Sequence, residues 1–223
     1  MAALEIAGYR FRDAELLATA LTHSSYLHEH VGKGVRDFER LEFLGDAVVD
    51  LVIGEELYRR FPEATEGELT SLRAMLVSSA ALAAIGRELG LPDRARLGRG
   101  EEETGGRARM GLAASLYESF IGAVYHEAGL ARAKDIVLET MGDALDDIAH
   151  TPIKSAKQLL QEWAQGAKLA LPAYRMLEVT GPEHQRDFEV EVEVGGNVAR
   201  GTGASKREAQ EAAAAKLLEL VTK

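Results

Sequence analysis

Four carboxylates between Glu39 and Asp50 are the residues of this sequence whose spacing points most clearly to chemistry. Glu39, Glu42, Asp46 and Asp50 follow one another at intervals of three, four and four residues. In a helix this spacing places all four side chains on one face. Two interpretations are open at this point: the solvated polar face of an amphipathic helix, or a site where carboxylate oxygens hold a divalent cation.

The residues around these carboxylates favour the cation. Apart from the acidic face, this helix is apolar nearly all round. Its apolar residues are Leu41, Phe43, Leu44, Val48, Val49, Leu51 and Ile53. We therefore expect a helix that is largely buried, and buried carboxylates need partners. No lysine interrupts the stripe, and like charges one turn apart repel each other. A bound cation would supply the partner and relieve the repulsion.

A second helix carries a matching set of residues. Ser115 and Glu118 lie three residues apart, and Gly122 permits another helix to pack closely. The chain has no cysteine, and its six histidines show no metal-ligand spacing; His23 is interpreted as a hydrogen-bonded structural residue. Hard oxygen ligands indicate Mg²⁺, which Mn²⁺ could replace, and carboxylates that converge from two helices suit metal-assisted hydrolysis of phosphodiesters.

The elements that must position these groups are helices. Asp13 is expected to cap a short helix, and apolar periodicity predicts helices over residues 40–60, 69–89, 112–127 and 131–147. No strand is expected before residue 150, and the Gly-rich residues 98–111 are predicted to be a flexible loop. Pro152 disfavours helix at the residue before it. We therefore expect an all-α domain over residues 1–150 and a second domain over residues 155–223.

The second domain has a different pattern. Ser155 with Gln158 and Ser205 with Glu208 each form the sequence pattern of a capping box, which predicts a helix at either end of the domain. Between them a strand over residues 173–179 and the alternation of Phe188, Val190, Val192 and Val194 with glutamates indicate a half-buried sheet. With a third strand leading to Gly203, the expected order is α-β-β-β-α, a small α+β domain.

Charge and composition agree with a soluble cytoplasmic protein. The net charge of −10 lies in residues 1–150, since residues 151–223 carry ten Lys and Arg against ten Asp and Glu. Bound cations would compensate this acidity. The absence of cysteine fits a reducing compartment. No apolar run reaches the roughly 18–20 residues of a membrane span, and the N-terminal residues lack a signal-peptide pattern. We expect a cytoplasmic location and no membrane partner.

The stretch from Glu39 to Asp46, Glu-Arg-Leu-Glu-Phe-Leu-Gly-Asp, resembles the signature of the bacterial ribonuclease III family. Three further stretches resemble that family in the same order. They are Leu21-Thr22-His23-Ser24-Ser25, Glu66-Gly67-Glu68-Leu69 leading to Leu72-Arg73-Ala74, and Glu118-Ser119-Phe120-Ile121-Gly122-Ala123. The resemblance covers nearly the whole chain.

This resemblance implies an all-helical endonuclease domain that works as a homodimer and cuts both strands of double-stranded RNA. It implies that Glu42 and Glu118 ligate Mg²⁺, that Asp46 acts with Glu118 as an essential catalytic carboxylate, and that Glu39 and Glu66 lie nearby. Water would attack the phosphodiester and leave 5′-phosphates and short 3′ overhangs. The expected role is processing of ribosomal RNA precursors and structured messenger RNA.

Two positions qualify the resemblance. The family usually has an aspartate where this chain has Ser115, and Gly111 replaces a commoner polar residue. A hydroxyl is a weaker ligand than a carboxylate, so we expect Ser115 to bind Mg²⁺ directly or through water, with lower affinity. Phe43 would fill a cavity in the partner subunit by the same resemblance, or it packs in the core of its own domain.

The second domain resembles a double-stranded RNA-binding domain, whose helices and one loop contact successive minor grooves and the phosphates between them. The residues that this resemblance assigns to RNA are Gln158, Gln161, Glu162, His184, Lys206 and Arg207. Lys206 and Arg207 begin the last helix, where free N–H groups favour phosphate; otherwise they are a solvated helix start. Ala204 stands where relatives often carry another lysine, so modest affinity is expected.

The sequence thus predicts a dimeric, Mg²⁺-dependent endoribonuclease of double-stranded RNA. Two alternatives belong to other classes. One is a non-catalytic double-stranded-RNA-binding protein that keeps the fold, which Ser115 leaves open. The other is a metal hydrolase of small phosphate esters, against which the second domain argues.

Overall fold

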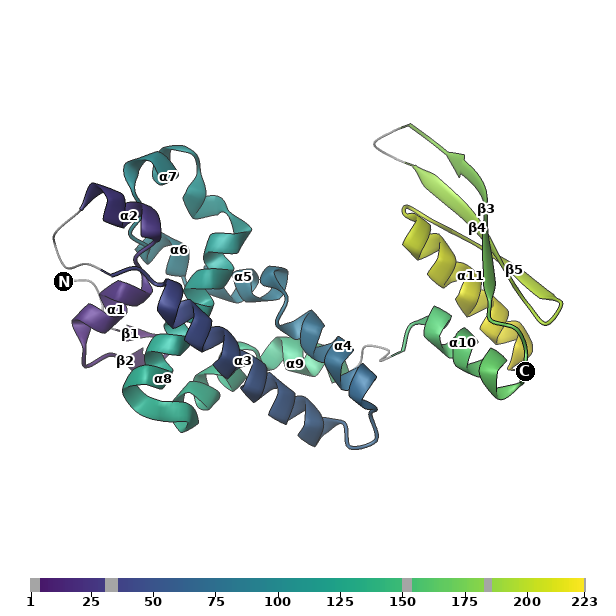
Figure 1. The fold of residues 1–223 in the computed structure, drawn as a ribbon, viewed down its shortest axis with the longest axis horizontal. Helices are drawn as coiled ribbons and strands as arrows, with labels where there is room; N and C mark the ends of the chain where they lie inside the picture. Colours follow the sequence, from purple (N-terminus) through teal and green to yellow (C-terminus); the bar gives the residue numbers. More distant parts are fainter. Residues whose placement is uncertain (1–4, 31–35, 150–153, 183–185, 223) are drawn as a thin grey trace. The chain divides into compact units, whose positions relative to one another are not determined.

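The computed structural model describes residues 5–30, 36–149, 154–182 and 186–222. Contacts divide the chain into two compact units, Met1–Thr151 and Pro152–Lys223. The first is helical and the second combines three strands with two helices (Figure 1). This is the predicted fold class, an all-α domain followed by a small α+β domain, and it is confirmed.

The first unit consists of helices apart from one small hairpin. Its strands are β1 (Glu5–Ile6) and β2 (Tyr9–Arg10), and its helices are α1 (Ala14–Ala20), α2 (Ser24–Glu29), α3 (Glu39–Arg60), α4 (Glu66–Leu76), α5 (Ser79–Glu88), α6 (Leu91–Arg94), α7 (Arg99–Glu103), the 3-10 turn η1 (Gly106–Ala108), α8 (Met110–Thr140) and α9 (Gly142–Ala149). The prediction that this part has no strand was wrong for the hairpin. Two-residue strands are too short to produce a recognisable alternation.

Helices α3 and α8 lie side by side at the centre of this unit (Figure 1). Leu116, Tyr117 and Phe120 on α8 are fully buried. Helix α8 has a kink at Gly129, whose φ of 80° and ψ of 178° are not helical, so two helical segments meet there. That backbone conformation is accessible essentially to glycine alone, which explains why the sequence pattern indicated two helices here.

Two other predicted boundaries were wrong. The expected helix over residues 69–89 is broken at Val77, and Ser78 caps the new helix α5 by accepting from the Ala81 N–H. The expected flexible loop over residues 98–111 contains α7, η1 and the first residues of α8. Arg107 gives this segment its structure, since its guanidinium donates to the carbonyl oxygens of Pro92 and Ala95.

Helix α3 is buried along one face only. Its buried residues include Val48, Val49, Val52 and Ile53, which face the core. Phe43 is 80% exposed and Leu51 is 56% exposed. The expectation that this helix is buried nearly all round was therefore wrong, and so is core packing as the role of Phe43.

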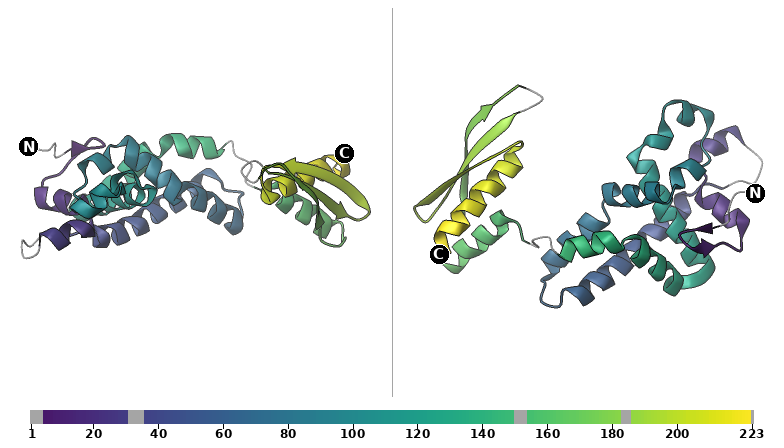
Figure 2. Two further views of the ribbon diagram at one scale, coloured as in Figure 1. Left: turned by 90° about the horizontal axis from the view of Figure 1, so that it is seen from above. Right: turned by 180° about the vertical axis from the view of Figure 1, so that it is seen from behind.

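The second unit is a three-stranded antiparallel sheet covered on one face by two helices (Figure 2). Its elements are α10 (Ala156–Gly166), β3 (Ala173–Thr180), β4 (Asp187–Val194), β5 (Asn197–Gly203) and α11 (Lys206–Val221). In the register, Val192 lies opposite Tyr174 on one side and Ala199 on the other. All three face the helices, so the alternation predicted for β4 matches the buried face.

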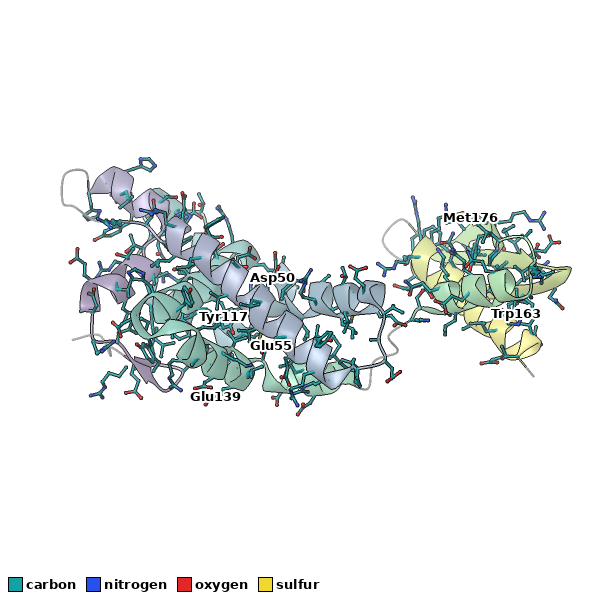
Figure 3. The ribbon with its side chains drawn as sticks, turned by 60° about the horizontal axis from the view of Figure 1, so that its bottom comes forward. Asp50, Glu55, Tyr117, Glu139, Trp163 and Met176 are labelled. Carbon is teal, nitrogen blue, oxygen red and sulfur yellow. The ribbon has the colours of Figure 1, made fainter. Side chains whose placement is uncertain are left out.

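The core of this unit joins the sheet to both helices. Leu160 and Ala164 of α10, Val192 of β4 and Ala213 and Leu217 of α11 form it. Trp163 packs against this cluster, and Figure 3 shows its place on α10.

Hydrogen bonds at the two helix starts confirm the first predicted capping box in full and the second in part. Ser155 and Gln158 form the complete predicted capping box. Ser205 caps α11, but Glu208 accepts from the Ala204 N–H instead of from Ser205. Within the described residues, no single helix is long and apolar enough to cross a membrane, although α4 and α5 together, bent at their junction, reach that length and composition.

Candidate active site and RNA-binding surface

Two glycines bring α3 and α8 into backbone contact. A Cβ on Gly45 would lie 1.7 Å from the carbonyl oxygen of Glu118, and a Cβ on Gly122 would lie 2.1 Å from that of Leu41. No larger residue fits at either position without moving the helices apart. The close approach sets Glu118 of α8 level with the segment of α3 that carries Glu42 and Asp46.

This placement raises the pKa of the Glu118 carboxyl group. Burial, together with smaller effects from the negative charges of Asp46, Glu42 and Asp50 in that order of size, raises the pKa of Glu118 to about 7. The effect requires all four groups to be near one another, so the structure brings the predicted residues of two distant segments together. Figure 3 shows Asp50 on α3 and Tyr117 on the neighbouring α8.

Within the residues that the structure describes, no cationic side chain forms an ion pair with these acidic groups. Glu42, Asp46, Asp50 and Glu118 make no side-chain hydrogen bond or ion pair with any other residue that the structure describes. Asp46 is exposed, while Glu42, Asp50 and Glu118 are half-buried. A concentration of unpaired carboxylates at this depth is electrostatically unfavourable in the protein alone.

The donor set suits a hard divalent cation. Carboxylate oxygens from two helices and the nearby hydroxyl of Ser115, also half-buried, are ligands that Mg²⁺ accepts. The side chains are not gathered around one point: in the described part of the chain no three His, Cys, Asp or Glu side chains are close enough to hold a metal ion. The residues fit the ion by their chemistry and by their backbone placement, and their side chains must turn toward one another to share it.

Two supporting residues from the sequence are less closely connected. Glu39 is exposed in the first turn of α3. Glu66 is exposed at the start of α4, where its carboxylate accepts a hydrogen bond from the Thr70 hydroxyl. Neither contributes to the raised pKa of Glu118, whereas Asp50 does. Asp50 belongs to the predicted stripe but was not assigned to the site, and its position one turn after Asp46 is the signal that could have found it.

His23 has the structural role that the sequence indicated. Its Nδ1 accepts from the Ser25 N–H and contacts the Ser25 hydroxyl at 2.8 Å, which caps α2. Ser25 in turn accepts from the Gly98 N–H. His23 therefore joins α2 to the segment before α7 and lies outside the acidic group.

The second unit presents the predicted RNA-binding side chains at its surface. Gln158, Gln161 and Glu162 are exposed on α10, and Lys206 and Arg207 are exposed in the first turn of α11. His184 lies outside the described residues. The structure thus places the described members of this set on two helix surfaces of one domain.

Two of these side chains have partners of their own. The amide oxygen of Gln158 accepts from the Ser155 N–H at 2.9 Å, so it is used in the helix cap. Glu162 accepts from Lys154 Nζ at 2.8 Å, which fixes its carboxylate and offsets its charge. Of the two polar groups of the Gln158 side chain, the NH₂ then remains available as a donor toward RNA. The carboxylate of Glu162 can accept a hydrogen bond from a ribose hydroxyl.

The glutamates of β4 face away from the helices. Glu191 is bridged by Arg175 at 2.6 Å and by Arg200 at 3.0 Å, from the strands on either side. Their guanidinium groups lower the pKa of Glu191. Both arginines are therefore occupied by Glu191 and offer little free positive charge for phosphate on this face.

Both parts of the chain match known families. Residues 13–145 match the Ribonuclease-III-like family model, and residues 156–221 match the Double-stranded RNA binding motif. Each of the two matched ranges lies within one of the two structural units.

Curated relatives match over nearly the whole chain. Ribonuclease 3 of Anaplasma phagocytophilum is 42% identical over 219 residues, which is 98% of this chain and 91% of that protein. Ribonuclease 3 of Nitratidesulfovibrio vulgaris is 44% identical over 219 residues, covering 97% and 86% of the two chains. Among solved structures, the nuclease domain of ribonuclease III from Campylobacter jejuni is 41% identical with a TM-score of 0.57, and covers 61% of this chain and 92% of that one.

Proposed function

Because the chain belongs to the ribonuclease III family and is an endoribonuclease of double-stranded RNA, we propose that Mg²⁺ bound between α3 and α8 supports its reaction. Glu42, Ser115 and Glu118 would hold the ion, and Mn²⁺ could replace it. The observation that carries this proposal is the close contact of α3 and α8, which brings Glu118 near three carboxylates of α3 and raises its pKa, while no described residue forms an ion pair with any of the four.

The reaction is the hydrolysis of a phosphodiester bond by water. When bound, a divalent cation would act as a Lewis acid: it would lower the pKa of the attacking water and stabilise negative charge on the departing 3′ oxygen. Asp46, the exposed carboxylate of the group, acts with Glu118 by accepting a hydrogen bond from that water and orienting it toward phosphorus. Departure of the 3′ oxygen leaves the phosphate on the 5′ end. Glu39 and Glu66 would support the site from its edges.

An apolar strip on α3 supports a homodimer. Phe43, Leu51 and Tyr58 are 80%, 56% and 75% exposed along one side of the helix, and Met75 on α4 is 52% exposed. Exposed apolar side chains arranged on one face are typical of an interface. The Campylobacter jejuni structure concerns a region involved in dimer formation of its nuclease domain. In our proposal Phe43 enters a cavity of a second copy, and two active sites then cut the two strands with a short 3′ overhang.

The second unit would bind the duplex. Gln158, Gln161 and Glu162 would contact the minor groove, and His184 the next minor groove. Lys206 and Arg207 would contact phosphates at the start of α11, where N–H groups and the helix dipole favour anions. We propose processing of ribosomal RNA precursors and structured messenger RNA in the cytoplasm as the role of this activity.

The test uses the full chain with a long RNA duplex. Incubation with Mg²⁺ is expected to produce short duplexes with 5′-phosphate ends, whereas EDTA, single-stranded RNA of the same sequence, or the Glu118→Gln variant gives no cleavage. Glu118→Gln keeps the shape of the side chain and removes its charge. Binding of the duplex without cleavage by the unaltered chain, at any Mg²⁺ or Mn²⁺ concentration, would instead identify a non-catalytic double-stranded-RNA-binding protein.

A further inference from the structure

Arg73, in the last turn of α4, reaches across to α3. Its Nη1 lies 3.9 Å from the position that a Cβ on Gly54 would take. Gly54 therefore leaves the surface of α3 open at this point, and the guanidinium of Arg73 lies against it. A larger side chain at residue 54 would push the guanidinium away.

Gly54 lies beyond Asp50, the last carboxylate of the acidic stripe. It follows Asp50 by four residues, so it lies one helical turn further along the same side of α3. On α4, Arg73 follows Glu66 by seven residues and shares its face. Arg73 thus lies between the carboxylates of α3 and the acidic start of α4, on the side of the domain that carries the candidate site.

The guanidinium of Arg73 is half-buried, yet it has no hydrogen bond or ion pair with any residue in the described part of the chain. Other half-buried arginines of this unit are engaged: Arg60 binds Glu56 and Asp146, and Arg107 binds Glu102. A guanidinium presents several N–H donors in a plane, and these match two oxygens of a phosphate. Arg73 therefore has donors available toward solvent, against the turn of α3 that follows Asp50.

We propose that Arg73 binds a backbone phosphate next to the scissile bond and so positions the RNA strand on the acidic face of α3. This inference rests on the proposed function, because it assigns Arg73 to the same substrate and the same site. A positive charge at this place offsets part of the repulsion between RNA phosphates and the acidic stripe of α3, and Gly54 leaves the space that the guanidinium of Arg73 occupies. It is a substrate-binding residue of the nuclease unit and takes no proton from water.

Binding is measured with the full chain in the Glu118→Gln background, so that the duplex stays intact. Arg73→Ala is expected to weaken duplex binding about tenfold and to lower the slope of log Kd against log salt concentration by about one, as for the loss of one phosphate contact. Arg10→Ala is the matched control, because Arg10 is an exposed arginine on the β1–β2 hairpin paired with Glu5. It is expected to leave the slope unchanged.

Cleavage kinetics separate this role from a catalytic or structural one. In the otherwise unaltered chain, Arg73→Ala is expected to raise KM about tenfold with kcat changed less than threefold. Arg73→Lys keeps the charge without the planar fork, so it should restore the salt slope and only part of the affinity. Gly54→Leu, which displaces the guanidinium without changing the net charge, should resemble Arg73→Ala, whereas Gly54→Ala should not.

Three results would overturn the proposal. They are an unchanged salt slope in Arg73→Ala, a lower Tm of Arg73→Ala with normal KM, and a shift of Arg73→Ala to a monomer in sedimentation, which would make Arg73 an interface residue. The binding measurement does not require cleavage. If the unaltered chain binds duplex but never cuts it, the proposed function fails while the salt slope still decides the role of Arg73.

Discussion

Gly45 and Glu118 are in backbone contact across two helices, since a Cβ on Gly45 would lie 1.7 Å from the Glu118 carbonyl oxygen. Gly122 has the same relation to Leu41 at 2.1 Å. The distance between α3 and α8 is therefore set by the absence of side chains at two positions. The carboxylates of the site lie on either side of this contact, so its geometry controls their spacing.

Replacing Gly45 with alanine is expected to abolish cleavage and destabilise the fold. A methyl group at 1.7 Å from a backbone oxygen forces α3 and α8 apart, and overpacking of this severity costs about 3 kcal/mol or more. Urea unfolding gives the loss of stability and duplex cleavage gives the loss of activity. Gly111→Ala on α8 is the control, because a Cβ there meets nothing within 4 Å, and its stability should stay within about 1 kcal/mol. Equal activity of the two variants would contradict the proposed role of the contact.

Glu118→Gln is expected to stabilise the metal-free protein at alkaline pH. Burial and the neighbouring acids raise the pKa of Glu118 from 4.5 to about 7 in the folded chain. The folded state therefore holds this proton more tightly than the unfolded state, and the contribution of Glu118 to stability falls as pH rises from about 4.5 to 7. Glutamine carries no charge and escapes this loss.

The measurement is the free energy of unfolding in EDTA at pH 5 and pH 8, for both proteins. The gain of the variant should be small at pH 5 and about 1–2 kcal/mol at pH 8, after allowance for the solvent that screens this partly exposed group. Excess Mg²⁺ at pH 8 should reverse the order, because only the unaltered chain keeps the full ligand set. A difference that does not vary with pH would show that Glu118 lies apart from the other carboxylates.

The sequence predicted the fold class and the acidic residues because both depend on local periodicity. The stripe on α3, the cap at Ser155 and the alternation in β4 are short-range patterns that can be recognised from neighbouring residues alone. Gly45 was not singled out, because its partner lies far along the chain and only the folded structure shows the contact. Exposure of Phe43 was equally hidden, since an apolar residue beside a polar stripe has the same pattern in a core and in an interface.

The position of Arg73 could not be predicted from periodicity either. Its helix could be recognised, but its contact with Gly54 depends on how α4 turns back after α3. The break at Val77 was missed for a related reason: apolar residues continue through it, and only the Ser78 cap separates the helices. Local signals therefore supplied the candidate site residues, while the contacts between elements came from the structure.

Phe43→Ala is expected to weaken self-association of the full chain. Phe43 is 80% exposed, so its loss removes no core packing and the Tm of the monomer should not fall. Burial of an aromatic anchor at the centre of an interface contributes about 2 kcal/mol or more, so the dimer dissociation constant should rise about 30-fold or more. Sedimentation equilibrium measures this, with Leu130→Ala on α8, 41% exposed, as the control. Unchanged dimerisation of Phe43→Ala would exclude Phe43 from the interface.

Lys206→Ala is expected to weaken binding of duplex RNA without altering the nuclease unit. Lys206 is exposed in the first turn of α11, where N–H groups also favour phosphate. Loss of one phosphate contact should lower the slope of log Kd against log salt concentration by about one. Lys216→Ala removes another exposed lysine further along the same helix and serves as the control. If both variants lose the same amount of slope, general charge and not the start of α11 explains the binding.

Ser115→Asp is expected to lower the Mg²⁺ concentration that gives half-maximal cleavage. Ser115 lies one turn before Glu118 on α8 and is half-buried, so an aspartate there adds a negative ligand to the same group. Ser115→Ala removes the hydroxyl, and the three proteins should rank Asp, Ser, Ala in order of rising Mg²⁺ requirement. In EDTA at pH 8 the aspartate variant should be the least stable, because a further carboxylate joins a repelling group, and Mg²⁺ should raise its Tm most. A half-maximal Mg²⁺ concentration that is the same for all three would mean that residue 115 does not contact the ion, and Glu42 and Glu118 alone would then remain as its proposed protein ligands.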